Sequence, residues 1–207
     1  MKIKIISLSI LCSAALIFNA CKKDSSSANQ DNSTELKAQS EDQSQFSTEV
    51  DAVANDANAA LSTNATMNGG RMEGSPICDA TIAVDSTSNP RTITITYNGS
   101  NCLGTRTRTG VVVLSMPANT QWKNAGAAVT VTITNLKITR VLDGKSITLN
   151  GSKTITNVSG GLIYQLSQGS ITHTITSSGI TVTFDNNSQR TWQIAEQRVF
   201  TYNNGIV

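Results

Sequence analysis

The sequence predicts a mainly β protein, in which an antiparallel meander forms a sandwich or a curled half-barrel and is preceded by one N-terminal α-helix. From residue 75 onward, apolar and polar residues alternate with a period of two in short runs. Gly, Asn, Asp and Ser separate these runs, and connections this short cannot make parallel crossovers. Residues 41–62 repeat apolar residues at helical spacing instead. We therefore expect a helix over 41–62 and a β domain over 75–207.

The first residues have the layout of a bacterial secretory signal. Two lysines precede an apolar run over residues 5–17, which is shorter than the ~20 residues that a membrane-spanning helix needs. We expect residues 1–20 to be removed as a lipoprotein signal peptide, so that Cys21 becomes the mature N-terminus. Several acyl chains on Cys21, palmitate among them, would then anchor the protein durably in a membrane. The alternative is an ordinary cut after Ala15, which would leave Cys21 as an unmodified thiol.

Residues 21–40 are mostly Ser, Asn, Asp, Gln and Lys, a composition typical of a flexible tether. Ser40 and Gln43 then fit a capping box at the start of the predicted helix. The helix carries one narrow apolar stripe, made of Phe46, Val50, Val53, Ala57 and Leu61. We expect the stripe to pack on the β domain, and the alternative is a short coiled coil with a second copy. Residues 63–74 are expected to form a linker.

The β domain is expected to contain about eight to ten strands. The alternating runs place strands at residues 81–85, 91–97, 106–116, 129–142, 146–157, 162–167, 170–177, 179–184 and 189–202. In the fourth of these, the inward apolar positions shift after Ile133, which predicts a β-bulge near Asn135. Asp143 and Gly144 form a strong hairpin signal between the fourth and fifth strands.

Two cysteines remain for the folded domain once Cys12 leaves with the leader and Cys21 carries lipid. Cys78 and Cys102 lie in an exported chain, so we expect a disulfide between them that locks the mouth of the first hairpin. Such a loop stabilises a fold by ~3 kcal/mol in the chain-entropy account. The sequence has no Cys-x-x-Cys pair and one histidine, His173, far from both cysteines. We expect neither a metal nor another cofactor.

The order of these segments resembles the uncharacterised surface lipoproteins of the Bacteroidetes. The features that carry the resemblance are the leader, Cys21-Lys22-Lys23-Asp24, the Ser/Asn-rich tether, the short acidic helix and the Thr-rich β domain. The resemblance implies an outer-membrane location, and lysine and acidic residues directly after the lipidated cysteine are associated there with cell-surface exposure. It implies no particular activity. We expect a lipid-anchored envelope protein with a structural or binding role.

Charge is unevenly distributed along the mature chain. Acidic residues dominate positions 21–70, whereas basic residues dominate positions 71–207. Within the β domain Arg106 and Arg108 point to the same face, and Lys137 or Arg140 would join them if the third and fourth strands pair. Such a cluster can hold phosphate or sulfate groups, which makes an anionic glycan or lipopolysaccharide a candidate partner. The alternative is an ordinary solvated sheet face.

Two further functions stay open. The curled sheet and the helix could enclose an apolar ligand such as an acyl chain, which would require a dry cavity. A hydrolase would have to use His173, yet His173 lies on the same side of its strand as Ile171 and Ile175 and is therefore expected to be a partly buried sheet residue. A Ser-His-Asp centre is recognised by geometry, so sequence order does not exclude one. The chain contains no GxSxG, HExxH, Walker or dinucleotide motif, and we do not expect an enzyme.

Threonine fills the outward positions of several strands, as at Thr130, Thr132 and Thr134. This is typical of a solvent-exposed strand, and the alternative is a regular array for binding ice or a crystalline glycan. Only 4% of the residues are aromatic. Stacking platforms for sugars or single-stranded nucleic acid are therefore poorly supplied, and we expect no nucleic-acid partner. The candidates are Trp122, Trp192, Phe200 and Tyr202.

Overall fold

The computed structural model describes residues 28–64, 67, 77–167 and 169–202. Within these ranges one long helix precedes seven strands and one short 3₁₀ turn, η1. Their order is α1 (Ala28–Thr63), β1 (Ala80–Asp85), β2 (Arg91–Ser100), β3 (Arg106–Met116), β4 (Ala127–Arg140), β5 (Ser146–Asn157), η1 (Ile163–Gln165), β6 (Ser170–Phe184) and β7 (Gln189–Thr201). The chain divides into two compact units, Met1–Glu41 and Asp42–Val207. The second unit carries the sheet together with the helix residues from Asp42 onward.

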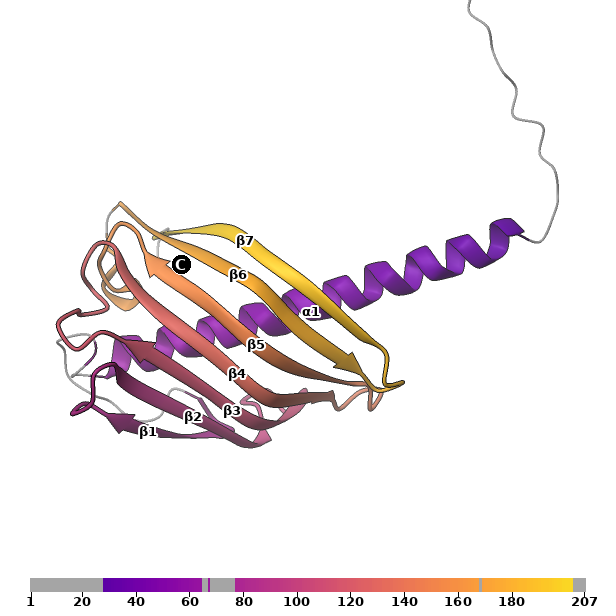
Figure 1. Cartoon of the computed structure of the whole chain (residues 1–207), viewed down its shortest axis with the longest axis horizontal. Helices are drawn as coiled ribbons and strands as arrows, with labels where there is room; N and C mark the ends of the chain where they lie inside the picture. The colour runs from indigo at the N-terminus through magenta and orange to yellow at the C-terminus, as the bar shows by residue number, and fades with distance from the viewer. Residues whose placement is uncertain (1–27, 65–66, 68–76, 168, 203–207) are drawn as a thin grey trace, which may run out of the picture. The chain divides into compact units, whose positions relative to one another are not determined.

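All seven strands belong to one antiparallel sheet in the order β1-β2-β3-β4-β5-β6-β7. Each strand pairs with its neighbours in sequence, which confirms the predicted meander. The sheet is strongly curved and open, with β1 and β7 as its two edges (Figure 1). The helix residues from Asp42 onward lie against its concave face. The fold is therefore a curled sheet filled by one helix.

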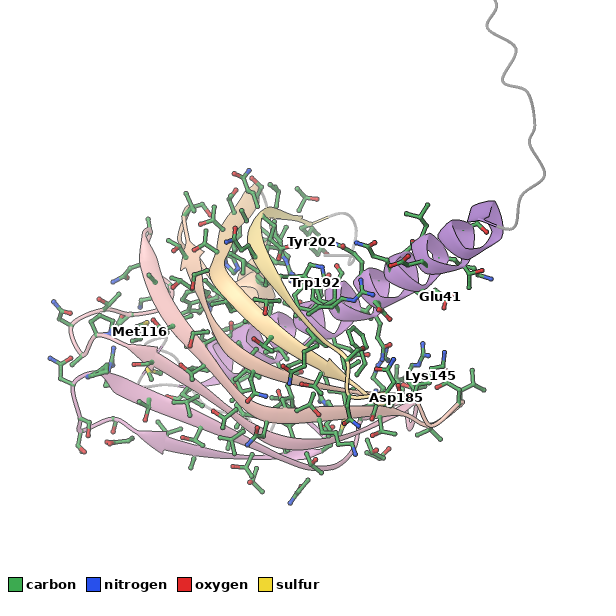
Figure 2. The ribbon with its side chains drawn as sticks, turned by 45° about the vertical axis from the view of Figure 1, so that its right-hand side comes forward. Glu41, Met116, Lys145, Asp185, Trp192 and Tyr202 are labelled. Carbon is green, nitrogen blue, oxygen red and sulfur yellow. A yellow bond between two sulfur atoms is a disulfide. The ribbon has the colours of Figure 1, made fainter. Side chains whose placement is uncertain are left out.

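The apolar stripe of the helix is buried against the sheet, as expected. Its five residues, Phe46, Val50, Val53, Ala57 and Leu61, are each at most 5% exposed. Phe46 stacks on Trp192 of β7 with ring centroids 4.6 Å apart, and Trp192 points from the sheet toward the helix (Figure 2). Full burial of such side chains stabilises a fold by roughly 1.5–3 kcal/mol each. The stripe therefore holds the helix on the sheet and is not free to form a coiled-coil seam.

The N-terminal start of α1 differs from the prediction. The helix begins at Ala28, so residues 28–40 are helical where a flexible tether was predicted, and Ser40 lies inside the helix and caps nothing. Residues 28–63 contain no Gly and no Pro, and Glu35, Leu36 and Lys37 are good helix formers. Residues 21–27 and most of the predicted linker over 63–74 lie outside the described residues. Of the linker, Met67 is fully buried and donates its backbone N–H to the Asn64 carbonyl oxygen at 3.1 Å.

The strand count also differs from the prediction in two places. The segments predicted as strands 170–177 and 179–184 form a single strand, β6, because register shifts between β5, β6 and β7 absorb the extra residues around Ser178. The segment predicted as strand 162–167 contains the short 3₁₀ turn instead. The Asn157 side chain holds this loop, since it donates to the Gly161 carbonyl oxygen at 2.9 Å and accepts from the Gly160 N–H at 3.0 Å.

The predicted β-bulge at Asn135 is confirmed. The pairing of β4 with β5 shifts between Ile133 and Leu136, and Asn135 adopts a positive φ of 48°. On β3, directly opposite, Gly110 has a φ of 126°. A Cβ atom at Gly110 would lie 2.6 Å from the Cα atom of Leu136, so the close approach of the two strands requires glycine here.

The predicted disulfide is confirmed, and the hairpin predicted at Asp143 and Gly144 is present with a longer turn than the two residues predicted. Cys78 and Cys102 form a disulfide with a Cα–Cα distance of 5.2 Å. Gly144 adopts a positive φ of 68° in the β4–β5 turn, where its N–H donates to the Arg140 carbonyl oxygen. The connection is longer than two residues because β4 ends at Arg140.

Candidate functional site

Charged side chains line the seam between the helix and the sheet on both sides of the apolar stripe. The acidic partners come from α1, and the basic partners come from β3 and β7. The ion pairs across the seam are Glu49–Arg106, Asp56–Arg108, Asp51–Arg198 and Asp42–Arg190. The acidic helix and the basic β domain, distinguished already in the sequence, therefore neutralise one another at close range.

Arg108 is the centre of the most buried part of this network. Its Nε and Nη2 atoms donate to the two carboxylate oxygens of Asp79, and its Nη1 atom donates to Oδ2 of Asp56, each at 2.6 Å. Tyr97 donates its hydroxyl to the same Asp56 oxygen at 2.9 Å, and the guanidinium lies 4.4 Å from the Tyr97 ring centroid. These hydrogen bonds therefore fix the guanidinium, the two carboxylates and the tyrosine hydroxyl relative to one another.

The electrostatics of the cluster keep Arg108 charged and Tyr97 neutral. Burial alone would lower the pKa of Arg108, but the hydrogen bonds that it donates to Asp79 and the negative charge of Asp56 raise the pKa overall. Burial and the adjacent Asp56 carboxylate raise the pKa of the Tyr97 hydroxyl well above its usual value. The tyrosine therefore acts here as a hydrogen-bond donor at every physiological pH.

Glu49 and Arg106 form the more open end of the network. The Nε atom of Arg106 donates to Oε1 of Glu49 at 2.6 Å. The Glu49 side chain is 1% exposed, whereas that of Arg106 is 29% exposed. The second carboxylate oxygen of Glu49, Oε2, is buried and accepts no hydrogen bond from any residue that the structure describes. A buried carboxylate oxygen without a donor is costly and rare in folded proteins.

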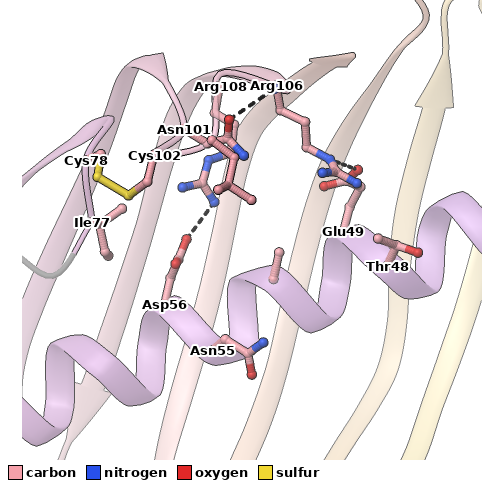
Figure 3. Close-up of a pocket in the computed structure, with 12 residues that line it drawn as sticks. Thr48, Glu49, Asn55, Asp56, Ile77, Cys78, Asn101, Cys102, Arg106 and Arg108 are labelled. Carbon is pink, nitrogen blue, oxygen red and sulfur yellow. Dashed lines mark hydrogen bonds and ion pairs between the residues drawn. A yellow bond between two sulfur atoms is a disulfide. The ribbon is translucent and has the colours of Figure 1, made fainter. Parts of the chain in front are cut away.

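A pocket of about 280 Å³ opens at this end of the seam. Figure 3 shows Glu49 and Asp56 reaching into it from the helix, with Arg106 and Arg108 opposite them on β3. The apolar part of its wall comprises Ala52, Ile77, the Cys78–Cys102 disulfide and Leu103, and the uncharged polar part comprises Thr48, Asn55 and Asn101. The pocket thus combines carboxylate and guanidinium groups with an apolar surface.

Of the four residues predicted to bind an anion, the structure brings three arginines to one face of the sheet and gives each of them a carboxylate partner. Arg106 and Arg108 share a face of β3, and Arg140 lies directly across from Arg106 on β4, but each of these arginines pairs with a carboxylate. Arg140 binds Asp143 at 2.6 Å. Lys137 pairs with Thr109 in the ladder and is exposed on the opposite, convex face. The carboxylate partners of Arg106 and Arg108 come from distant segments, which the strand pattern does not reveal.

His173 is a buried core residue. It is 3% exposed and lies edge-to-face between Trp122 and Phe200, at ring-centroid distances of 5.2 and 5.1 Å. Burial and the positive charge of Arg198 lower the pKa of His173 to about 4, so the imidazole is neutral at neutral pH. Its Nε2 atom makes no hydrogen bond with any described residue. A Ser-His-Asp centre requires such bonds, and the hydrolase hypothesis gains no support from this geometry.

Lys153 is a buried cation that the sequence analysis missed. It is 2% exposed, and its Nζ atom donates to the Val50 carbonyl oxygen of the helix at 2.7 Å. Burial and the positive charge of Arg198 lower the pKa of Lys153 to about 7. A signal was present, because Lys153 occupies an inward position of β5 in the same alternation as Ile155.

Within the described residues, no group of three or more His, Cys, Asp and Glu side chains is arranged to hold a metal ion. No helix within the described ranges is long and apolar enough to cross a membrane. Cys21 lies outside those ranges. Comparison with protein-family models, curated proteins and solved structures finds no significant match to this chain.

Proposed function

We propose that this chain is a lipid-anchored protein of the bacterial cell envelope, held at the outer membrane through acylated Cys21, with its curled β domain serving a binding role. The leader, the cysteine that follows it and the likeness to Bacteroidetes surface lipoproteins support the anchor. The same likeness supports exposure at the cell surface. The protein would act by holding a ligand at the envelope.

The observation that carries the binding role is the buried Glu49 Oε2 atom beside the pocket. Buried polar atoms are normally paired, and an exception in an otherwise satisfied network indicates a missing partner. Across the same pocket, the guanidinium of Arg106 makes its hydrogen bond with described residues through Nε alone. The remaining guanidinium donors of Arg106 are thus free to face a ligand or water.

The surrounding network makes this pocket rigid. Arg108 ties β3 to the segment before β1 and to the helix, and the Cys78–Cys102 disulfide closes one side. A binding site gains affinity when its groups are held in place before the ligand arrives. The ion pairs therefore serve the pocket as well as the fold.

The other candidate ligands fit this geometry less well. An acyl chain would need an apolar enclosure, whereas the concave face is filled by the helix stripe and this pocket presents charged groups. An anionic glycan or lipopolysaccharide would have to compete with Glu49, Asp56 and Asp79 for the two arginines of β3. A polar ligand that is not an anion is the better match.

Fractionation of cells tests the anchor. The wild-type protein is expected in the outer-membrane fraction, whereas Cys21→Ala is expected to lose that association because the acylated sulfur is gone. Cys12→Ala is the matched control, since it removes a cysteine inside the leader without touching the lipidation site, and it should fractionate as the wild type does. Equal membrane association of Cys21→Ala and the wild type would overturn the proposed anchor.

A further inference from the structure

We infer that the pocket between α1 and β3 binds a primary ammonium group carried on a short aliphatic stem. The inference rests on the proposed binding role and names its ligand class. Three features of the pocket point to this chemistry: the balance of charge, the kind of hydrogen-bonding group left unpaired, and the apolar wall beside it.

The balance of charge favours a cation. Glu49 pairs one to one with Arg106, whereas Asp56 and Asp79 share the single guanidinium of Arg108. This end of the seam therefore has one more carboxylate than it has guanidinium groups, and the excess negative charge lies with Asp56 and Asp79. Uncompensated buried charge is destabilising, and a bound ammonium would neutralise it. A bound phosphate or carboxylate would add to the excess instead.

The unpaired hydrogen-bonding group is an acceptor. Oε2 of Glu49 is buried without a donor among the described residues, whereas Arg106 is exposed enough for water to reach its remaining N–H groups. All three nitrogen atoms of Arg108 already donate to carboxylates. Glu49 Oε2 therefore lacks a donor, and an ammonium supplies three donors and no acceptor. Bonds between charged partners are about twice as strong as neutral ones.

A second carboxylate extends the negative potential along the helix. The hydrogen bonds that Asp56 accepts from Arg108 and Tyr97 both use Oδ2, and its side chain is 20% exposed. Glu49 and Asp56 are separated by two helical turns and both line the pocket. A cation entering the pocket thus approaches two carboxylates in succession, which also raises its association rate.

The apolar wall suits an aliphatic stem. Ala52, Ile77, the disulfide and the exposed Leu103 line the pocket beside its charged groups. Alkylammonium groups combine a charged head with methylene groups that pack on apolar surface. The volume of about 280 Å³ lies near the lower end of small-molecule sites, so the stem should be short.

Calorimetric titration of the full mature protein in detergent tests the inference. The probes are n-butylammonium, its neutral analogue 1-butanol, butyrate and glucose. We expect n-butylammonium to bind and the other three to show no binding. Glu49→Gln keeps the shape of the side chain but removes its charge, and it should weaken n-butylammonium binding roughly tenfold to a hundredfold. Glu35→Gln, on an exposed helix position, should leave the affinity unchanged.

A variant at an exposed position of the pocket mouth tests the site without disturbing the folded core. Leu103 is 81% exposed, so Leu103→Lys should fold normally while it places a permanent ammonium at the entrance. This variant should weaken n-butylammonium binding, and Leu103→Met should not. Circular dichroism and thermal unfolding of each variant verify that it is folded.

The outcomes separate the ligand class from the binding role. If butyrate or glucose binds instead, and binding depends on Glu49 or Arg106, the ammonium inference is wrong while the binding role stands. If n-butylammonium binds with the same affinity to Glu49→Gln and Leu103→Lys as to the wild type, the assigned pocket is wrong. If none of the four probes binds the folded wild-type protein, the proposed ligand class is overturned.

Discussion

Arg108 donates two parallel hydrogen bonds to Asp79, in which Nε and Nη2 each lie 2.6 Å from a different carboxylate oxygen. The Asp79 side chain is fully buried, and that of Arg108 is 8% exposed. Through its third nitrogen the same guanidinium reaches Asp56 on the helix. One side chain therefore joins β3, the segment beside the disulfide and α1.

Breaking this pair should be strongly destabilising. In Arg108→Met, Asp79 would remain buried without a cation, and we expect the free energy of unfolding to fall by roughly 3–5 kcal/mol. Urea denaturation measures this. Arg140→Met is the matched control, because the Arg140–Asp143 pair is 36% exposed on both sides and should contribute less than about 1 kcal/mol. Similar losses in the two variants would show that the buried pair has no special role.

His173 should make the fold sensitive to acid. Burial lowers its pKa from 6.5 to about 4. Between pH 6.5 and pH 4 the unfolded chain therefore binds a proton at His173 that the folded protein does not bind. Stability contributed by the neutral imidazole is therefore lost as the pH falls from about 6.5 to 4. His173→Phe keeps a ring between Trp122 and Phe200 but cannot titrate.

The measurement is the free energy of unfolding of both proteins at pH 7 and pH 4.5. Relative to its own value at pH 7, the wild type should lose roughly 2 kcal/mol more than His173→Phe at the lower pH. An identical pH dependence in the two proteins would mean that His173 titrates normally in the folded state.

The buried charge of Lys153 should lower the free energy of unfolding at neutral pH and below. Its pKa falls from 10.5 to about 7 in the folded protein, so the penalty for burying its charge is full below pH 7 and is relieved as the pH rises toward 10.5. The charged groups that act on it are Arg198, Glu196 and Asp51.

Lys153→Met should consequently raise the free energy of unfolding by roughly 1–4 kcal/mol below pH 7, and the gain should shrink at higher pH. Thermal or urea unfolding at pH 6.5 and pH 10 provides the comparison. A variant that is less stable than the wild type at pH 6.5 would show that the bond from Lys153 to the Val50 carbonyl outweighs the cost of burial.

Gly110 should not tolerate a side chain. Its φ of 126° is unfavourable for other residues, and a Cβ atom would lie 2.6 Å from the Leu136 Cα atom. We expect Gly110→Ala to lower the free energy of unfolding by roughly 2 kcal/mol or more. Gly99→Ala on β2 is the control, since its nearest neighbour would lie at 3.6 Å, and it should cost less than about 1 kcal/mol. Equal losses of stability in the two variants would show that the close approach at Gly110 does not exclude a side chain.

Most of the features that were predicted correctly from the sequence follow from local periodicity. The strands β3 and β5 match their predicted bounds, and each ends on a buried inward residue, Met116 or Asn157. The bulge at Asn135 was visible as a slip in the same alternation. The disulfide followed from two cysteines remaining in an exported chain, and the helix stripe from its spacing.

The features that were missed depend on interactions that alternation does not report. Residues 28–40 lack an apolar stripe, so their helical state rests on intrinsic propensity alone. The apolar residues after Gly161 look like a strand, but the Asn157 side chain holds that segment in a loop. The break expected at Ser178 is absorbed as an irregularity within β6.

The candidate site was predicted only in part. Arg106 and Arg108 were correctly placed on one face, but their carboxylate partners Glu49, Asp56 and Asp79 are at least 29 residues away in the chain. Which charges meet is decided by where the helix lies on the sheet, and a single strand pattern carries no such information. Lys153, by contrast, could have been found from its inward position.

The intact mass of membrane-extracted protein tests the proposed anchor most directly. The proposal predicts a chain that begins at Cys21 and carries the added mass of a diacylglycerol and a further acyl chain, whereas Cys21→Ala should carry no lipid. Digestion and sequencing of the N-terminal peptide would place the modification on Cys21. A wild-type chain with an unmodified Cys21, or one that begins after Ala15, would contradict the account.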